Sequence, residues 1–138
     1  MPIKTTIKID NSALKKQANK ALDAYAKALD PVLDQQFKDV KWEWWTNAPT
    51  RRRNGQLAGN PRNIIDTGEL LNSKIGPTKG QGNAYIGTRR WVWNSPYAVY
   101  VRDGYMTSLG NVVSGRDWIK AAMTELPFEA YVARFLKQ

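Results

Sequence analysis

Apolar residues recur at three- and four-residue steps through the first third of the chain, the spacing that places side chains on one face of an α-helix. The positions are Leu14, Ala18, Ala21/Leu22, Tyr25, Leu29, Val32/Leu33, Phe37, Val40 and Trp44. The stripe keeps its phase across Pro31, so we expect one long helix with a kink at that residue and no helical hairpin.

A helix of this length exceeds the size of a compact domain. About 35 residues at 1.5 Å each reach roughly 50 Å, whereas a globule of this chain length is about 37 Å across. We therefore expect the helix to bend or overhang, with a second copy of the chain covering the overhanging stripe.

Other segments follow different patterns. Residues 1–10 alternate apolar and polar side chains, which predicts an N-terminal strand or arm. Residues 47–61 are rich in polar, Pro and Gly residues and predict an exposed basic loop without regular structure. The segments 74–79 and 84–93, joined by a glycine-rich turn, predict a β-hairpin.

The remaining elements are short. Asp66 or Thr67 is expected to cap a helical turn that ends at residue 71. Ser95 and Pro96 predict the start of a brief helix that Gly104 ends. A loop follows, with a possible strand at 111–114.

A last helix is predicted to start at Arg116 or Asp117, with a second kink at Pro127. The pattern indicates a single α+β domain over residues 1–138. We expect the long kinked N-terminal helix and the C-terminal helix to pack on a small, mostly antiparallel sheet that contains the hairpin.

Composition narrows the chemistry. The chain has no cysteine and no histidine, so thiolate and imidazole ligands and the usual neutral-pH proton shuttle are missing. We expect no enzyme activity, no cofactor and no metal. Asp66 and Glu69 have the spacing of a paired acid site, but a helix start with an acidic first turn accounts for them better, and a metal-dependent nuclease is the third-ranked alternative.

The chain shows no run of about 18 apolar residues and no apolar signal-peptide block. We therefore expect a soluble protein, intracellular when made, with no membrane partner.

The positive charge is concentrated in the middle of the chain. The net charge is +9, and residues 47–116 hold ten Lys/Arg against three Asp/Glu. Such an excess indicates a polyanion nearby, either DNA or an acidic protein surface, although solubility alone is an alternative. The basic residues expected to face one of these partners are Arg51, Arg52, Arg53, Arg62, Lys79, Arg89 and Arg90.

Six tryptophans are several times the ordinary number for 138 residues. Trp44 continues the helix stripe and is expected in the core. The other aromatic residues that we predict at interfaces between subunits are Trp42, Trp45, Trp91, Trp93, Tyr97 and Tyr100. An aromatic core and stacking on single-stranded nucleic acid are the alternatives.

Three motifs occur in a characteristic order. They are Arg62-Asn-Ile-Ile-Asp66-Thr67-Gly68-Glu69-Leu-Leu-Asn-Ser73, Ser95-Pro96-Tyr97-Ala98-Val99-Tyr100-Val101-Arg102-Asp103-Gly104, and Gly115-Arg116-Asp117-Trp118. Over roughly residues 60 to 120, the chain resembles the tail-completion and head-tail joining proteins of tailed bacteriophages, the group that includes minor tail protein Z. Two positions depart from that family: Arg102 stands where members usually carry an acidic residue, and Gly115 where a proline often precedes the arginine.

The resemblance implies a structural virion protein of the phage neck, made in the host cytoplasm. It implies a homo-oligomeric ring, often a hexamer, with the head connector or adaptor and the tail tube as neighbours. Such a tail-completion, tail-terminator or head-tail joining ring lets DNA pass and contacts it without sequence preference. The alternative function is a sequence-nonspecific DNA-binding accessory protein.

Overall fold

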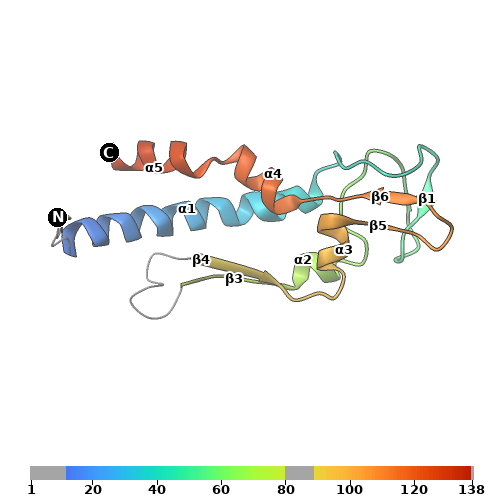
Figure 1. The fold of residues 1–138 in the computed structure, drawn as a ribbon, viewed down its shortest axis with the longest axis horizontal. Coiled ribbons are helices and arrows are strands. Elements are labelled where there is room, and N and C mark those ends of the chain that lie inside the picture. The colour runs from blue at the N-terminus through green and yellow to red at the C-terminus, as the bar shows by residue number, and fades with distance from the viewer. Residues whose placement is uncertain (1–11, 80–88, 138) are drawn as a thin grey trace, which may run out of the picture.

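The computed structural model describes residues 12–79 and 89–137, with the backbone alone at 12–16 and 79. These residues form five helices and six strands (Figure 1). The helices are α1 (Ser12–Lys38), α2 (Glu69–Asn72), α3 (Ala98–Asp103), α4 (Trp118–Glu125) and α5 (Phe128–Leu136). The strands are β1 (Thr50–Arg51), β2 (Leu57–Ala58), β3 (Lys74–Lys79), β4 (Arg89–Trp93), β5 (Gly104–Met106) and β6 (Val112–Ser114).

The long helix α1 runs along most of an elongated molecule. Helices α4 and α5 lie along one side of it and the β3–β4 hairpin along the other (Figure 1). The remaining short elements gather beyond the C-terminal end of α1. They form what we call the wide end of the molecule, made of α2, α3, β1, β2, β5 and β6.

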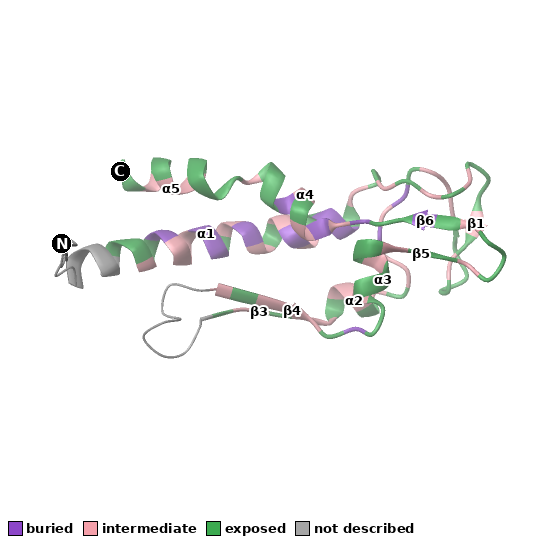
Figure 2. Cartoon of the chain, in the orientation of Figure 1, coloured by how far each residue is buried: buried purple, intermediate pink, exposed green. Residues whose placement is uncertain are grey.

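The core lies where α1 meets α4, and the buried positions concentrate there (Figure 2). Trp118 is its largest fully buried side chain. Its ring centroid lies 5.1 Å from that of Phe37 and 5.4 Å from that of Trp93. The other members of the buried cluster are Tyr25, Leu29, Leu33, Ile64 and Ala122. The first and last thirds of the chain therefore share one core.

The α+β class is confirmed, with the sheet divided into three two-stranded antiparallel sheets. The predicted hairpin is the pair β3–β4, in which Lys74 lies opposite Trp93 and Ile75 opposite Val92. Its turn, residues 80–88, lies outside the described residues, as does the strand or arm predicted at 1–10. The C-terminal helices pack mainly on α1, and Trp118 of α4 also contacts Trp93 of β4.

The N-terminal helix differs from its prediction in two ways. α1 ends at Lys38, six residues before Trp44, and continues through Pro31 without interruption, so the predicted kink is not shown. Its 27 residues span about 40 Å. From Ala21 to Phe37 its apolar stripe is covered by the same chain, so no second copy is needed there.

The C-terminal helix is divided. Pro127 lies between α4 and α5, and it stands at the N-cap of α5 with extended backbone angles. Proline lacks the N–H that the preceding helix needs and suits a new helix start, so the predicted kink becomes a break.

Three further short elements differ from their predictions. The basic segment 47–61 contains β1 and β2, which pair with each other. α2 begins after Gly68, which is its N-cap residue and whose φ of 85° is unfavourable for other residues. The predicted cap Thr67 lies one residue earlier, and its hydroxyl accepts a hydrogen bond from the Glu69 backbone N–H at 3.3 Å. The segment after α3, predicted as a loop, begins with β5, which pairs with the correctly predicted β6.

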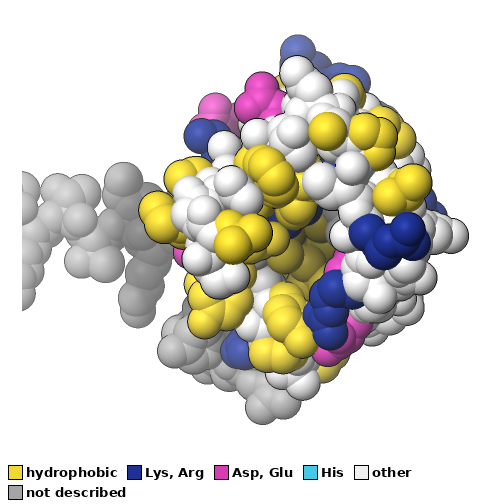
Figure 3. All heavy atoms as spheres, turned by 90° about the vertical axis from the view of Figure 1, so that its right-hand side faces the viewer, with side chains coloured by type: hydrophobic (Ala, Val, Ile, Leu, Met, Phe, Trp, Pro, Cys, Tyr) yellow, Lys and Arg dark blue, Asp and Glu magenta, His cyan; other side chains and the backbone are white. Residues whose placement is uncertain are grey.

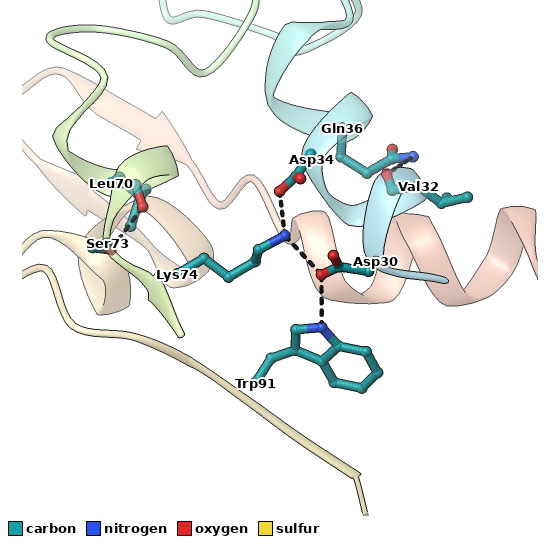
Figure 4. A network of polar contacts seen from close by, with 8 residues as sticks. All are labelled: Asp30, Val32, Asp34, Gln36, Leu70, Ser73, Lys74 and Trp91. Atoms are coloured by element: carbon teal, nitrogen blue, oxygen red, sulfur yellow. Dashed lines mark hydrogen bonds and ion pairs between the residues drawn. The ribbon is translucent and has the colours of Figure 1, made fainter. Parts of the chain in front are cut away.

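A polar cluster attaches the hairpin to α1. The Lys74 ammonium donates hydrogen bonds to Asp30 Oδ1 at 2.7 Å and to Asp34 Oδ1 at 2.8 Å (Figure 4). The indole of Trp91 donates to the same Asp30 oxygen at 3.0 Å. Burial lowers the pKa of Lys74, but the hydrogen bonds to the two carboxylates outweigh it, and the net pKa is raised.

Candidate functional site

The wide end of the molecule contains a hollow of about 600 Å³. Figure 3 shows it as a depression with apolar side chains inside and charged side chains at its edge. Its walls come from the segment before α2, from α2 and α3, from β5 and from residue 116. Phe37 and Ile64, both in the buried core, belong to its lining. The hollow thus reaches from the core to the surface.

Arg62 is a structural part of this hollow and is only 4% exposed. Its side chain donates to the carbonyls of Gly59 and Ala58 and to the hydroxyl of Thr50, at 2.7 to 2.8 Å. Its guanidinium carbon lies 4.1 Å from the centroid of the Trp44 ring. Burial, with the nearby positive charges of other arginines, lowers the pKa of Arg62. Arg62 therefore attaches the β1–β2 hairpin to the domain. The sequence predicted that Arg62 would lie on an exposed basic surface, and the structure buries it instead.

Arg116 also lies over the Trp44 indole, with its guanidinium carbon 5.2 Å from the ring centroid. The residue is 7% exposed, and its backbone N–H donates to the Val101 carbonyl at 2.8 Å. Its buried Nε has no hydrogen-bond partner among the described residues, and neither has the buried Nε1 of Trp44. Burial lowers the pKa of Arg116, since a charge removed from water without a partner is unfavourable.

Arg51, Arg52 and Arg53 also line the hollow. Arg52 donates to the backbone carbonyls of Ile65 and Asn63. Arg53 is exposed and stacks over the Tyr97 ring at 4.5 Å. In the part of the chain that the structure describes, no carboxylate forms an ion pair with Arg52, Arg62 or Arg116.

Two acidic residues, Asp66 and Glu69, also line the hollow. The Asp66 carboxylate accepts a hydrogen bond from the Arg53 backbone N–H at 2.7 Å, and the Asp66 carbonyl accepts one from the Asn54 side chain. Asp66 therefore holds the tip of the β1–β2 hairpin. The alternative in which it pairs with Glu69 as an acid site has no support in this contact pattern.

The structure separates the predicted basic residues into two groups. Arg51, Arg52, Arg53 and Arg62 line the hollow. On the β3–β4 hairpin, Arg90 is exposed and Lys79 ends β3, but the Arg89 side chain is 6% exposed and pairs with Asp23 at 3.7 Å. Arg89 is therefore not on an exposed surface. The sequence did not identify Arg116 as part of the group, because no local pattern places a helix-start arginine near a tryptophan 72 positions earlier.

The predicted interface aromatics also fall into two groups. Trp45, Tyr97 and Tyr100 are exposed, and the two tyrosines line the hollow. The half-buried residues Trp42, Trp91 and Trp93 pack against the core. The indole N–H of Trp42 donates to the Gln36 carbonyl at 2.8 Å. Trp44 is half-buried under the two arginines, as part of the hollow instead of the α1 stripe.

All three motifs found in the sequence contribute to this one hollow. Residues 62–71 form one wall, Tyr97, Tyr100 and Val101 another, and Arg116 a third. The chain leaves 25 residues between the first and second of these segments and 14 between the second and third. Their convergence makes the hollow the strongest candidate for a functional site.

Comparisons with protein families, with curated proteins and with solved structures found no match for this chain. Of the helices in the described residues, none is long and apolar enough to span a lipid bilayer.

Proposed function

We propose that this protein is a structural subunit of the neck of a tailed bacteriophage, acting in tail completion, tail termination or head-tail joining. In this proposal, copies of the chain form a ring at the head-tail interface, most simply a hexamer, with connector and tail-tube proteins as neighbours. DNA passes through the ring. The motif resemblance supplies the class of protein, and the wide end of the molecule supplies the physical support.

The observation that carries the proposal is the apolar surface of the wide end. Large apolar side chains that are more than half exposed gather on α3 and on the β5–β6 hairpin. They are Val99, Tyr100, Met106, Leu109 and Val112, with Leu109 at 87% exposure. Isolated exposed apolar residues are ordinary, but a cluster of this kind marks an interaction surface.

This surface replaces the one expected from the sequence. The α1 stripe and the half-buried tryptophans are covered by the chain itself, so they offer little area to another subunit. Of the exposed members of the predicted set, Tyr97 and Tyr100 lie on or beside α3, and Trp45 lies in the segment after α1. Ring contacts are accordingly proposed through the wide end of the molecule.

The test is assembly of the full chain. We expect native mass spectrometry to detect closed oligomers whose population increases with concentration, and we expect the protein in purified particles at the neck by electron cryomicroscopy. Leu109→Glu should reduce the oligomer because it places a charge in an apolar contact. Leu136→Glu, at an exposed apolar position on α5, is the matched control.

A chain that is monomeric at every concentration and absent from purified particles would refute the proposal. Tight binding of duplex DNA by the monomer, weakening steeply with salt, would support the accessory DNA-binding protein instead.

A further inference from the structure

The hollow contains a buried cation, the guanidinium of Arg116. Arg116 is more than nine-tenths buried, has an unpartnered Nε and forms no ion pair within the described residues. Arg62 and Arg52 add positive charge nearby and spend their hydrogen bonds mainly on backbone carbonyls. An incoming anion with oxygen acceptors would neutralise this charge through the part of the Arg116 guanidinium that lines the hollow.

We propose that this hollow binds a carboxylate side chain or carboxyl terminus carried by an apolar segment of a partner protein. The guanidinium of Arg116 receives the carboxylate, and the apolar lining between the core and α3 receives the neighbouring side chain. The identity of the partner, an adjacent neck protein, rests on the proposed function.

The lining favours a peptide over nucleic acid. A base would need a free aromatic face, yet the Trp44 ring lies under Arg62 and Arg116, and the Tyr97 ring lies under Arg53. The phosphates of a duplex lie on the outside of a broad cylinder and make contact best with exposed arginines. The unpartnered cation here is at the inside of a concave site with an apolar lining.

Charge also argues against the wide end of a second copy of this chain as the occupant. The wide end carries the arginines of the middle region, which has ten Lys/Arg against three Asp/Glu. The acidic residue in the lining that faces the β1–β2 tip, Asp66, already accepts the Arg53 backbone N–H. Glu69 also lines the hollow but is exposed, and neither carboxylate forms an ion pair with Arg116. An acidic group of a separate partner can supply the complementary charge.

The test uses the full chain and a minimal probe, N-acetylphenylalanine, which joins one carboxylate to one apolar ring. Its amide, N-acetylphenylalaninamide, is the uncharged match. Titrations are followed by the arginine Nε–Hε signals and the tryptophan indole signals in ¹H–¹⁵N spectra. We expect saturable shifts at Arg116 and Trp44 with a Kd of about 1 to 10 mM, and binding of the amide weakened about tenfold or more.

Variants assign the effect to the site. Arg116→Met should abolish the shift at Trp44, and Arg116→Lys should weaken binding, because lysine keeps the charge but loses the planar fork of donors. Arg134→Met, at an exposed arginine on α5, should bind as the unaltered protein does. Near-ultraviolet circular dichroism shows whether Arg116→Met folds. If it does not, the same titration of Arg116→Lys and Arg52→Met tests the assignment to this site.

Three results would overturn the inference. These are equal binding of acid and amide, no shift at Arg116 up to about 50 mM probe, and displacement of the probe from Arg116 by inorganic phosphate or a short DNA duplex at lower concentrations. None depends on ring formation. A chain that binds the probe but never enters particles would retain the carboxylate site and lose only the neck proposal.

Discussion

Replacing Lys74 by methionine tests how the β3–β4 hairpin is attached to α1. The ammonium lies between Asp30 and Asp34, at 2.7 and 2.8 Å, and its side chain is 13% exposed. Lys74→Met keeps most of the side-chain volume but removes the charge and both hydrogen bonds. Asp30 retains the hydrogen bond from the Trp91 indole, whereas Asp34 loses its ammonium partner.

The expected cost follows from these contacts. A hydrogen bond to a charged group contributes about 1.5 to 3 kcal/mol when it is buried. Here both carboxylates are about a third exposed and recover part of their solvation from water, which lowers the value of each bond. The two carboxylates, one helical turn apart, then also repel each other by about 0.2 to 0.5 kcal/mol. We expect Lys74→Met to lower the free energy of unfolding by about 2 kcal/mol.

Urea denaturation, followed by tryptophan fluorescence, measures this change as a shift of the midpoint by about 1 M at an unchanged slope. Lys27→Met is the matched control, because Lys27 pairs with Asp23 at 3.2 Å with both side chains at least half exposed. The control should cost less than about 0.5 kcal/mol. Equal losses in the two variants would show that burial of the Lys74 cluster adds nothing and would refute the reasoning.

The pH dependence provides an independent check. Folding raises the pKa of Lys74 above its ordinary value of 10.5, so the folded state binds this proton more tightly than the unfolded state. The stabilisation is therefore fully present below about pH 10 and is lost as the pH rises through the folded pKa. The stability difference between the unaltered protein and Lys74→Met should stay constant from about pH 7 to 9 and shrink only above that ordinary value.

Further variants probe the core and the turns by the same urea assay. Trp118→Ala should cost about 3 to 5 kcal/mol by opening a cavity in the core, whereas Trp45→Ala, 43% exposed, should cost about 1 kcal/mol or less. Tyr25→Phe should cost about 1 kcal/mol, because its hydroxyl donates at 2.6 Å to the carbonyl that follows α4; an unchanged midpoint would contradict this. Gly104→Ala should cost about 3 kcal/mol or more, because φ is 90° and the new Cβ would lie 2.7 Å from a backbone oxygen of β6. Gly110→Ala, with φ of 84° but open space, should cost about 1 to 2 kcal/mol.

Several elements could be predicted because local chemistry determines them. The helical spacing of Tyr25, Leu29 and Phe37 identified α1 and the face that it buries. The end of α3 was predictable for a similar reason, since Gly104 adopts a positive φ that other residues avoid. The end of α1 was not predictable in this way, because Val40 and Trp44 continue the apolar spacing while the chain turns away after Lys38.

The candidate site was only partly predictable. The sequence identified Arg51, Arg52 and Arg53 as a basic group but could not indicate that their loop folds against the motif at 62–71. Of the other four predicted basic residues, Arg62 and Arg89 have side chains whose burial depends on distant partners. Arg62 lies over Trp44 and is buried. Arg89 pairs with Asp23, which lies far earlier in the sequence, in α1.

By itself, the sequence determined the positions of α1, of the β3–β4 hairpin, of α3 and of the last helical segment, and it determined the apolar face of α1. These features depend on residues within a few positions of one another. The sequence also determined the basic charge and the absence of thiol and imidazole groups. Only the tertiary structure decided that α4 and α5 cover α1 and that Arg116 reaches Trp44. Those contacts join segments far apart in the chain. The residues that pack around an arginine decide whether it is buried as part of the structure or stays exposed.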